Sequence, residues 1–392
     1  MIGYYVHHQG QGHRRRATAV AREMACPVVG LGTGDAPEGW PGEWVSLAAD
    51  DEPAVPDEAM ADVTAGGVLH WVPRGHAGLL ERHRQVVEWL SRVRPALVVV
   101  DVSVEVALLV RLCGVPVVVG AMPGDRTDAV HALAYDVAEA LLAPWPQGAH
   151  PDAGWPQAWY EKTWHVGGIS TLAPAAATST SDREGVRSAR DASDASGAAT
   201  PSDREGVRCA SDADTPADRP RRVLVVWGNG GDPLREVDVD AARAATPGWE
   251  WAVRGGGWPV AADLAQDLAD ADVVVCHAGQ GSVADVAQLR RPAVVLAQPR
   301  PYDEQDATVR ALTRMGLAVT AYGWPQDYRW PELLERALAT GGERWGAWGG
   351  DGAARAAARL DSLAGRLGED PAGGRGTSQA AAATLTREDR SS

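Results

Sequence analysis

The sequence predicts an α/β protein made of two Rossmann-like, doubly wound domains that face each other across a cleft. First, short runs of β-branched residues alternate with amphipathic helical segments, as in parallel sheets covered by helices on both faces. Second, these segments form two blocks separated by a long polar tract. Third, a chain of 392 residues is long enough for two domains with a core each.

The first block spans residues 1–165, and we expect it to form one Rossmann-like domain. Apolar runs predict its strands at 2–6, 27–31, 97–100, 116–119 and 140–143. Helical periodicity predicts its helices near 13–25, 76–93, 103–113 and 127–138.

The second block, 221–366, repeats the alternation and predicts a second domain of the same kind. Its expected strands are near 222–227, 250–253, 272–276, 293–297 and 317–320. Its expected helices are near 238–245, 261–269, 281–290, 304–315 and 331–340. Two such domains joined by a linker bind ligands at the carboxyl ends of their strands, in the cleft between them.

Two tracts are expected to be disordered, a linker or insertion at 173–220 and a tail at 367–392. Both are rich in small and polar residues and poor in large apolar ones, so they cannot bury enough surface to fold. The linker contains Ser-Asp-Arg-Glu-Gly-Val-Arg twice, at 181–187 and 202–208. We interpret this repeat as a duplicated insertion rather than a binding array.

Charge, hydropathy and cysteine content narrow the class of protein. A net charge of −15 at pH 7 argues against a nucleic-acid-binding protein, which would carry a basic stripe. No signal-peptide pattern and no apolar run near the roughly 20 residues of a membrane span is present, so we expect a cytoplasmic protein. The cysteines lack paired spacing, which favours buried free thiols over a disulfide or a metal site: Cys26, Cys113, Cys209 and Cys276.

The most informative segment is the loop that follows the apolar strand at 272–276. A glycine turn there runs into a helical pattern, and the unpaired N–H groups of a helix N-terminus suit a phosphate. An alternative for the histidine of this loop is that it lies buried and only satisfies backbone carbonyls. We expect five residues of the loop to contact a diphosphate: His277, Gly279, Gln280, Gly281 and Ser282.

Three polar side chains near this loop are suited to the sugars of a nucleotide sugar. Asp285 lies one helical turn from the loop, where its carboxylate can accept hydrogen bonds from ribose hydroxyls. Asp303 and Gln305 follow the next strand and offer a carboxylate and an amide to sugar hydroxyls. Arg254, at the end of another strand, can meet a phosphate or the base, and Trp258 beside it either stacks on the base or packs in the core.

The first strand ends in a second glycine loop, which leads into a helix near Arg14. Gly10 and Gly12 permit a tight turn, and the imidazole of His13 can take a proton from an attacking hydroxyl. The alternative is that His13 only caps the turn. We do not expect a metal shared with His7 and His8, because neighbouring strand residues point to opposite faces.

Two further features of the first block have more than one interpretation. Asp101 ends the strand at 97–100, where it can orient His13, cap the next helix, or do both. Arg14, Arg15 and Arg16 occupy a first helical turn, where cations oppose the helix dipole. Either they reflect the arginine-rich composition, or an anion lies nearby, such as an acceptor phosphate or a lipid headgroup at a membrane surface.

The pattern His277-Ala-Gly-x-x-Ser282-x-x-Asp285, with Asp303-Glu304-Gln305 after the next strand, resembles the donor-binding signature of GT-B glycosyltransferases. Examples are the UDP-glycosyltransferases and the N-acetylglucosaminyltransferase of peptidoglycan synthesis, and the C-terminal domain resembles the glycosyltransferase family 28 type. The sequence departs from the signature twice. Asp285 stands in place of the usual Glu, and Thr308 in place of an Asn.

Three other segments resemble parts of the same families. The Gly-x-Gly-His13 loop is similar to their acceptor-side loop, and the segment from Asp101 to Pro116 is similar to the aspartate-bearing strand–helix unit of plant-type UDP-glycosyltransferases. The glycine loop after the strand at 222–227 resembles the loop that closes over the donor diphosphate, with Asn in place of a Ser. Its donor-binding residues would be Gly228, Asn229 and Gly230.

The resemblance implies a hexosyltransferase that moves a sugar from a nucleotide diphosphate sugar, a UDP-sugar first of all, to an acceptor hydroxyl. It implies an inverting reaction with His13 as the base, with no metal and no cofactor besides the nucleotide sugar. Two alternatives stay open: a sugar-nucleotide epimerase on the same fold, and a non-catalytic sugar-nucleotide-binding protein. The sequence does not predict the acceptor, the sugar or the oligomeric state.

Overall fold

The computed structural model describes residues 1–8, 10–52, 62–151, 153–172, 219–228 and 230–369. The linker at 173–218, the residues from 370 to 392 and Asn229 lie outside this part of the chain. The expectations for the linker, for the tail from 370 on and for Asn229 therefore stay predictions, whereas residues 367–369, which were expected in the disordered tail, belong to a helix.

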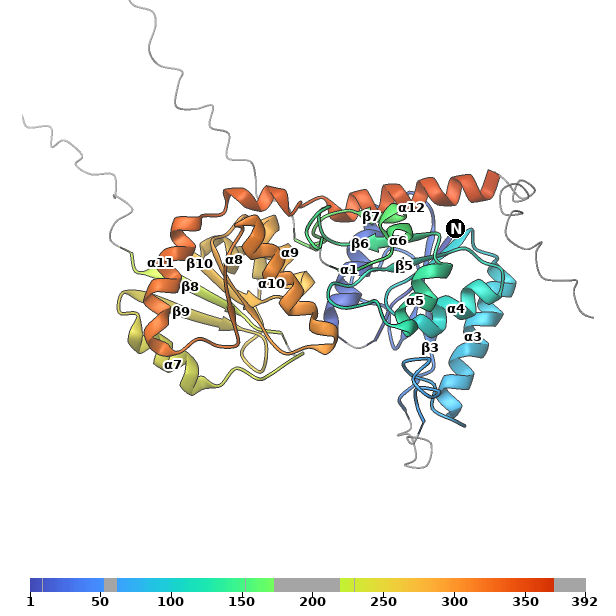
Figure 1. Ribbon diagram of the computed structural model, residues 1–392, viewed down its shortest axis with the longest axis horizontal. Coiled ribbons are helices and arrows are strands. Elements are labelled where there is room, and N and C mark those ends of the chain that lie inside the picture. Colours follow the sequence, from blue (N-terminus) through green and yellow to red (C-terminus); the bar gives the residue numbers. More distant parts are fainter. Residues whose placement is uncertain (9, 53–61, 152, 173–218, 229, 370–392) are drawn as a thin grey trace, which may run out of the picture.

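The described chain forms two lobes, each built around a parallel sheet (Figure 1). The N-terminal sheet has the strand order β3-β2-β1-β4-β5-β6-β7, and every neighbouring pair is parallel. Its strands are β1 (Ile2–Tyr5), β2 (Val28–Thr33), β3 (Glu43–Leu47), β4 (Leu97–Val100), β5 (Val117–Gly120), β6 (Ala140–Ala143) and β7 (Thr163–His165). Its helices are α1 (Gln11–Glu23), α3 (Ala77–Val93), α4 (Val104–Leu112), α5 (Ala129–Val137) and α6 (Gln157–Glu161).

The C-terminal sheet has the strand order β12-β11-β10-β8-β9, again with parallel neighbours throughout. Its strands are β8 (Arg221–Val226), β9 (Trp249–Arg254), β10 (Val273–His277), β11 (Ala293–Ala297) and β12 (Val319–Tyr322). The helices after β8 are α7 (Glu236–Ala245), α8 (Leu264–Asp270), α9 (Gln280–Gln288), α10 (Glu304–Met315), α11 (Trp330–Thr340) and α12 (Gly352–Glu369). Short 3-10 turns are η2 (Pro301–Asp303), η3 (Asp327–Arg329) and η4 (Glu343–Ala347).

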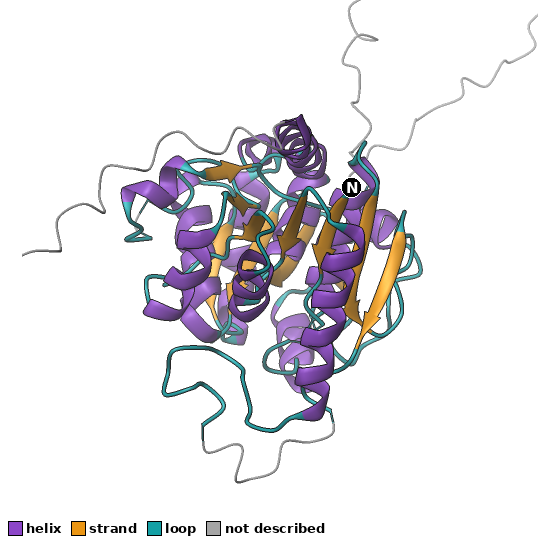
Figure 2. Ribbon diagram, turned by 90° about the vertical axis from the view of Figure 1, so that its right-hand side faces the viewer, coloured by secondary structure: helices purple, strands orange, loops and turns teal. Residues whose placement is uncertain are grey.

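The valine-rich runs form the central strands because a parallel sheet covered on both faces needs side chains that are apolar on both faces. All four residues of β4 and all five of β10 are buried. Helices lie on both sides of the strands in Figure 2. The predicted fold class, two Rossmann-like domains, is confirmed.

Besides the five-residue helix α6, three elements of the described chain were not expected from the sequence. The edge strand β3 was not predicted, because only Leu47 of its five residues is buried and the apolar run is short. The edge strand β7 has three residues, which is too short for a periodic pattern. The helix α12 was not predicted as a helix, because its apolar positions are mostly small alanines.

The helix α12 belongs by packing to the N-terminal lobe, although it ends the described chain. Figure 1 shows it running from the C-terminal lobe across the N-terminal one. Its residues Leu360 and Ala364 lie in one buried cluster with Tyr4 of β1. Asp361 accepts hydrogen bonds from the backbone N–H groups of Ala25 at 2.8 Å and Cys26 at 3.0 Å. The expected C-terminal domain, 221–366, therefore includes a helix that completes the core of the other domain.

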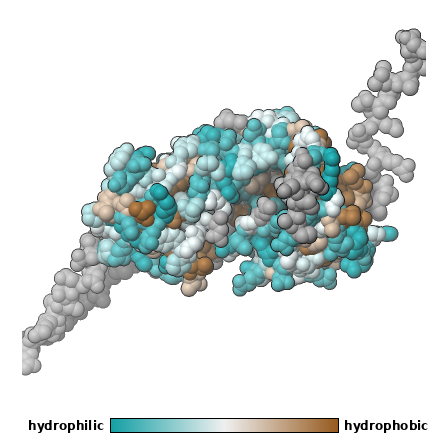
Figure 3. All heavy atoms as spheres, turned by 90° about the horizontal axis from the view of Figure 1, so that it is seen from below, coloured by the Kyte–Doolittle hydropathy of each residue, from teal (hydrophilic) through white to brown (hydrophobic). Residues whose placement is uncertain are grey.

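The surface is indented between the lobes when seen from below (Figure 3). A cavity of about 360 Å³ opens between them. Its lining comes from both lobes: Gly124, Asp125, Thr127, His150, Ala153, Gly154, Asp303, Ala307, Arg310 and Arg314.

Two expectations about the chain as a whole can be compared with the described residues. No described helix combines the length and the hydropathy that crossing a bilayer requires. Cys276 is a buried free thiol and Cys26 is a partly buried one. The expectation of burial is wrong for Cys113. That residue is exposed because it caps the solvent-facing end of α4.

Candidate functional site

His13 and Asp101 form an ion pair at the carboxyl edge of the N-terminal sheet. The strands β1 and β4 are neighbours, so the loop after β1 and the residue after β4 meet. The Nδ1 atom of His13 lies 2.6 Å from Oδ2 of Asp101, whose side chain is 2% exposed. This contact fixes the ring and leaves Nε2 as its other proton-accepting atom. The predicted orienting role of Asp101 has the geometry it requires.

Arg16 completes this cluster from the next turn of α1. Its Nη2 forms an ion pair with Oδ1 of Asp101, and the same nitrogen lies 3.3 Å from Nδ1 of His13. Burial alone would raise the pKa of Asp101, but the charges of Arg16 and His13 outweigh it and hold that pKa well below its usual value. Asp101 is therefore a carboxylate at neutral pH. The sequence did not reveal this partner of Arg16.

Two glycines and a second histidine shape the loop around His13. Gly10 has a φ of 92° and precedes α1, which therefore begins earlier than predicted. Gly12 has open space where a Cβ would be. The ring centroid of His7 lies 5.6 Å from that of His13 and 5.0 Å from that of His8. The expectation that His7 and His8 point to opposite faces is wrong, because β1 ends before them.

Burial and the neighbouring histidines lower the pKa of His7 to about 4, so this ring is neutral beside His13. Its Nδ1 atom is buried and has no hydrogen-bond partner. The neutral ring of His7 therefore adds no positive charge next to His13.

His277 lies at the end of β10, beneath the glycine loop that follows β8. Its ring packs at 3.9 Å from the ring of Trp227, and a Cβ on Gly228 would lie 3.6 Å from its Nδ1. Burial, with a contribution from Arg300, lowers the pKa of His277 to about 4. The imidazole is therefore neutral at pH 7. Its Nε2 is buried without a hydrogen-bond partner, so it does not satisfy a backbone carbonyl in the described chain.

The loops at the carboxyl ends of β10 and β11 contain further polar atoms without partners among the described residues. Nε2 of Gln280 and Oε1 of Gln298 are both buried and have no hydrogen bond in the described chain. Gly231 must lack a Cβ, because that atom would lie 2.1 Å from Oε1 of Gln298. At Gly230 a Cβ would lie 2.9 Å from a guanidinium nitrogen of Arg300. Buried polar atoms are nearly always paired, so this cluster is arranged for a polar ligand.

The helix α9 begins beside this cluster, and no side chain caps its N-terminus. Gly279 is the N-cap residue, and Gln280 is the first helical residue. Gly281 has open space at its Cβ position, and Ser282 is half-buried. The first amides of the helix therefore have no side-chain cap in the described chain, and the anion contact that the sequence predicts stays a prediction.

Asp285 has a different partner from the expected ribose. The hydroxyl of Ser170, in the segment that leaves the N-terminal lobe, donates to its Oδ1 at 2.5 Å. Burial raises the pKa of Asp285 to about 6, against smaller opposing contributions from Ser170 and Arg15. Asp285 thus holds the crossing between the lobes, and a ribose would have to compete with Ser170.

Two other predicted donor residues, Arg254 and Gln305, also bind protein groups, whereas Asp303 lies exposed. The guanidinium of Arg254 donates to Asp267 at 2.6 Å, which directs it toward α8. Gln305 is buried, and its Oε1 accepts from the backbone N–H of Gln298 at 3.0 Å. It therefore holds the loop rather than presenting its oxygen to a sugar. Asp303 is exposed at the interlobe cavity, with a positive φ of 53°.

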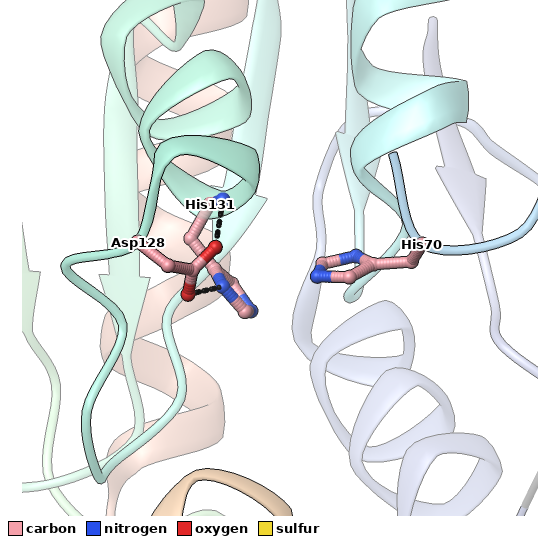
Figure 4. A group of neighbouring side chains, drawn as sticks. All are labelled: His70, Asp128 and His131. Atoms are coloured by element: carbon pink, nitrogen blue, oxygen red, sulfur yellow. Dashed lines mark hydrogen bonds and ion pairs between the residues drawn. The ribbon is translucent and has the colours of Figure 1, made fainter. Parts of the chain in front are cut away.

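A second histidine–aspartate cluster lies at the N-terminus of α5 (Figure 4). Nδ1 of His131 is 2.5 Å from Oδ2 of Asp128, and His70 faces this pair from a separate loop with its ring 4.7 Å from that of His131. The ligand atoms of the three residues lie within 4.8 Å of one another, which is compatible with a metal ion. However, Arg126 lies 3.2 Å from Nε2 of His131.

The position of Arg126 favours a hydrogen-bonded network over a metal centre at this cluster. A metal on Nδ1 of His131 would place a proton on Nε2, which would then face the donor groups of Arg126. Arg126 also lies over the ring of Tyr302 at 4.2 Å and forms an ion pair with Glu304 at 3.3 Å. The cluster therefore joins the N-terminal lobe to the donor-side loop before α10.

Comparison with known proteins supports the sequence-based family assignment. Residues 256–341 match the family model of the glycosyltransferase family 28 C-terminal domain. A comparison with curated protein sequences finds no match.

Solved structures resemble almost the whole chain at low sequence identity. The glycotransferase of kitacinnamycin is 16% identical and has a TM-score of 0.59, covering 92% of this chain and 98% of its own. CalG4, the calicheamicin glycosyltransferase, is 16% identical with a TM-score of 0.59, at 93% and 98% coverage. MurG from Acinetobacter baumannii is 16% identical with a TM-score of 0.52, at 93% and 99% coverage. Residues 256–341 thus match a glycosyltransferase family model, and the chain as a whole shares the two-domain fold of these glycosyltransferases.

Proposed function

We propose that the protein transfers a sugar from a nucleotide diphosphate sugar to an acceptor hydroxyl, with the donor held by the C-terminal lobe. The observation that carries this proposal is the buried Nε2 of His277, which, like the N-terminus of α9, has no side-chain partner among the described residues. A helix N-terminus attracts the negative charge that grows on a leaving diphosphate. The glycines at 228, 230 and 231 let a ligand approach the backbone closely.

The N-terminal lobe supplies the base in this reaction. Nε2 of His13 takes the proton of the acceptor hydroxyl, and the Asp101 carboxylate stabilises the imidazolium that forms. The hydroxyl oxygen forms a bond to the anomeric carbon as the bond from that carbon to the diphosphate oxygen breaks. A displacement in line inverts the anomeric centre. The amides of α9, rather than a metal ion, stabilise the diphosphate that leaves.

The donor we propose is a nucleoside diphosphate sugar of the UDP or TDP type. The resemblance of the His277 to Asp285 segment to UDP-glycosyltransferases supports UDP. A structure of the spinosyn rhamnosyltransferase SpnG in complex with thymidine diphosphate, with a TM-score of 0.50 and 16% identity, supports TDP. Both nucleotides offer the same diphosphate to α9. We propose a cytoplasmic location, where such donors are made.

The test is a donor-cleavage assay with UDP-, TDP- and GDP-sugars, because transferases slowly release the nucleoside diphosphate into water. Release in the presence of EDTA is the expected result. An epimerase would instead convert the sugar without releasing a diphosphate. The second alternative is a non-catalytic binder, and the hydrogen bond from Ser170 to Asp285, which competes with a ribose, is the observation that favours it. In that case the donor would raise the melting temperature of the protein without being cleaved.

A further inference from the structure

Arg16 connects the two lobes through its side chain. The helix α1, which carries Arg16, lies against α9 of the C-terminal lobe. While Nη2 of Arg16 pairs with Asp101, its Nη1 donates to Oε1 of Gln280, the first residue of α9. One side chain therefore contacts both the orienting carboxylate of the base and the donor-side helix. Only about 10% of that side chain is exposed.

The chemistry of the guanidinium determines how Gln280 is oriented. Arginine can only donate hydrogen bonds, so the atom of Gln280 that faces it must be the carbonyl oxygen. The amide therefore cannot be flipped, and its NH₂ group points away from Arg16. That Nε2 is buried and has no hydrogen-bond partner in the described chain, like Nε2 of His277. An amide fixed in this way has its donor group free for a ligand at the N-terminus of α9.

We propose that Arg16 is a positioning residue that couples the base to the donor site, and that the amide it orients, Nε2 of Gln280, donates a hydrogen bond to the departing diphosphate. This inference rests on the proposed function. Arg16 holds Asp101 and Gln280 only while the lobes are closed on each other. Asp101 therefore orients His13 fully only when α9 is in place. Because α9 binds the donor in this proposal, removal of the acceptor proton by His13 depends on a bound donor.

The charge balance of the bridge supports coupling rather than simple stabilisation. The single positive charge of Arg16 is neutralised by Asp101, and the neutral Gln280 accepts from the second nitrogen of the fork. A lysine has one compact ammonium and cannot span two acceptors on opposite sides of a cleft in this way. Arg16→Lys keeps the charge next to Asp101 and removes the bridge.

The experiment measures kcat and the donor KM for the wild type, Arg16→Lys, Gln280→Leu and the double variant, with donor cleavage or transfer as the assay. Each single variant should lower kcat by roughly 100-fold, the usual loss when one transition-state donor is removed, with the donor KM changed by less than about threefold. The double variant should be no slower than the slower single variant, because the two residues act through one path.

Gln280→Glu separates the bridge from the hydrogen bond to the donor. A carboxylate at this position still accepts from Arg16, so the bridge and the melting temperature are retained, but it has no N–H to donate. We expect kcat to fall by roughly 100-fold. Arg15→Gln, which changes an exposed arginine on the same helix, should change kcat by less than about threefold.

Three results would overturn the inference while leaving the proposed function intact. They are an Arg16→Lys enzyme as fast as the wild type, a fully active Gln280→Glu enzyme, and losses that multiply in the double variant. If the wild type released no diphosphate from any nucleotide sugar, the proposed function itself would fail.

Discussion

The two sides of the cleft differ in how their polar atoms are satisfied. On the N-terminal side, the Asp101 carboxylate contacts both the guanidinium of Arg16 and the imidazole of His13 within the protein. On the C-terminal side, His277 and Gln298 are neutral or polar groups with buried atoms that lack partners. The first cluster is held by contacts of Asp101 within the protein, whereas these donor-side atoms have no partner in the part of the chain that the structure describes.

This difference suggests what each side contributes. A base must be oriented before the acceptor arrives, and ion pairs within the protein provide that orientation. A donor site gains specificity when its buried groups are satisfied only by the correct ligand, because the wrong ligand leaves them unpaired. Substitutions on the two sides should therefore have opposite effects on the stability of the free protein and different effects on donor affinity.

The largest effect is expected from His13→Ala. Removing the base should lower kcat by about 1000-fold, within the range for a general base, while the donor dissociation constant changes by less than about twofold. Rate and calorimetric affinity would be measured on the same preparation. His8→Ala is the matched control from the same loop. A parallel loss of affinity and rate in His13→Ala would put His13 in the donor site.

Asp101→Asn should harm both activity and stability. It leaves Arg16 buried without a counter-charge, which we expect to cost about 3 kcal/mol of unfolding free energy and to slow transfer by roughly 100-fold.

The pH dependence of Asp101→Asn provides its check. Because the folded pKa of Asp101 lies below its usual 3.8, this carboxylate stabilises the fold above about pH 4, and that contribution is lost as the pH falls below it. Urea unfolding between pH 2 and 7 should show that loss in the wild type, and the part due to Asp101 should be missing in the variant. If the unfolding free energies of the wild type and the variant fell equally between pH 4 and pH 2, the ion pair of Asp101 would be contradicted.

His277→Phe should weaken donor binding by about 10- to 100-fold and leave the free protein as stable as before, or about 1 kcal/mol more stable. Phenylalanine keeps the contact with Trp227 and removes a buried nitrogen that has no partner. Calorimetric titration with UDP and TDP, together with urea unfolding of the free protein, measures both quantities. A destabilised free protein that bound the donor normally would show that His277 has a structural role.

The smallest effect is expected from Asp285→Asn. Since burial raises the folded pKa of Asp285 to about 6, the wild-type fold loses stability as the pH rises from about 4 to about 6. Asparagine can still accept from Ser170 but does not ionise. We expect the variant to be about 2 kcal/mol more stable at pH 7 and its stability to lack this decline. The unfolding free energies of both proteins would be measured by chemical denaturation at pH 4, 5, 6 and 7. If they changed in parallel with pH, the raised pKa of Asp285 would be disproved.

The central fold could be predicted from the sequence because buried parallel strands are continuous apolar runs. The run Val273 to Cys276 and the run Leu97 to Val100 could only be buried strands once helical segments flanked them. The edge strands β3 and β7 and the alanine-rich helix α12 were missed, because their burial comes from distant segments and not from a local pattern. α12 in particular packs against Tyr4, at the other end of the chain.

The sequence predicted a site residue where the local pattern around that residue was enough. It did not predict contacts that depend on a partner distant in the sequence. His13 and the His277 loop follow from local turns and helix starts. Asp285 was expected to meet a ribose, but nothing near it in the sequence indicates Ser170. Arg16 looked like one of three arginines in a biased composition, and only the fold brings it to Asp101 and Gln280.

Hydrogen–deuterium exchange with and without saturating UDP or TDP tests most directly whether the C-terminal lobe holds the donor. The account predicts new protection of the backbone amides at 277–282 and in the segment from 298 to 305, with little change around His13 until an acceptor is added. Protection confined to the loop and first turn around His13, with the amides at the start of α9 exchanging as in the free protein, would contradict it.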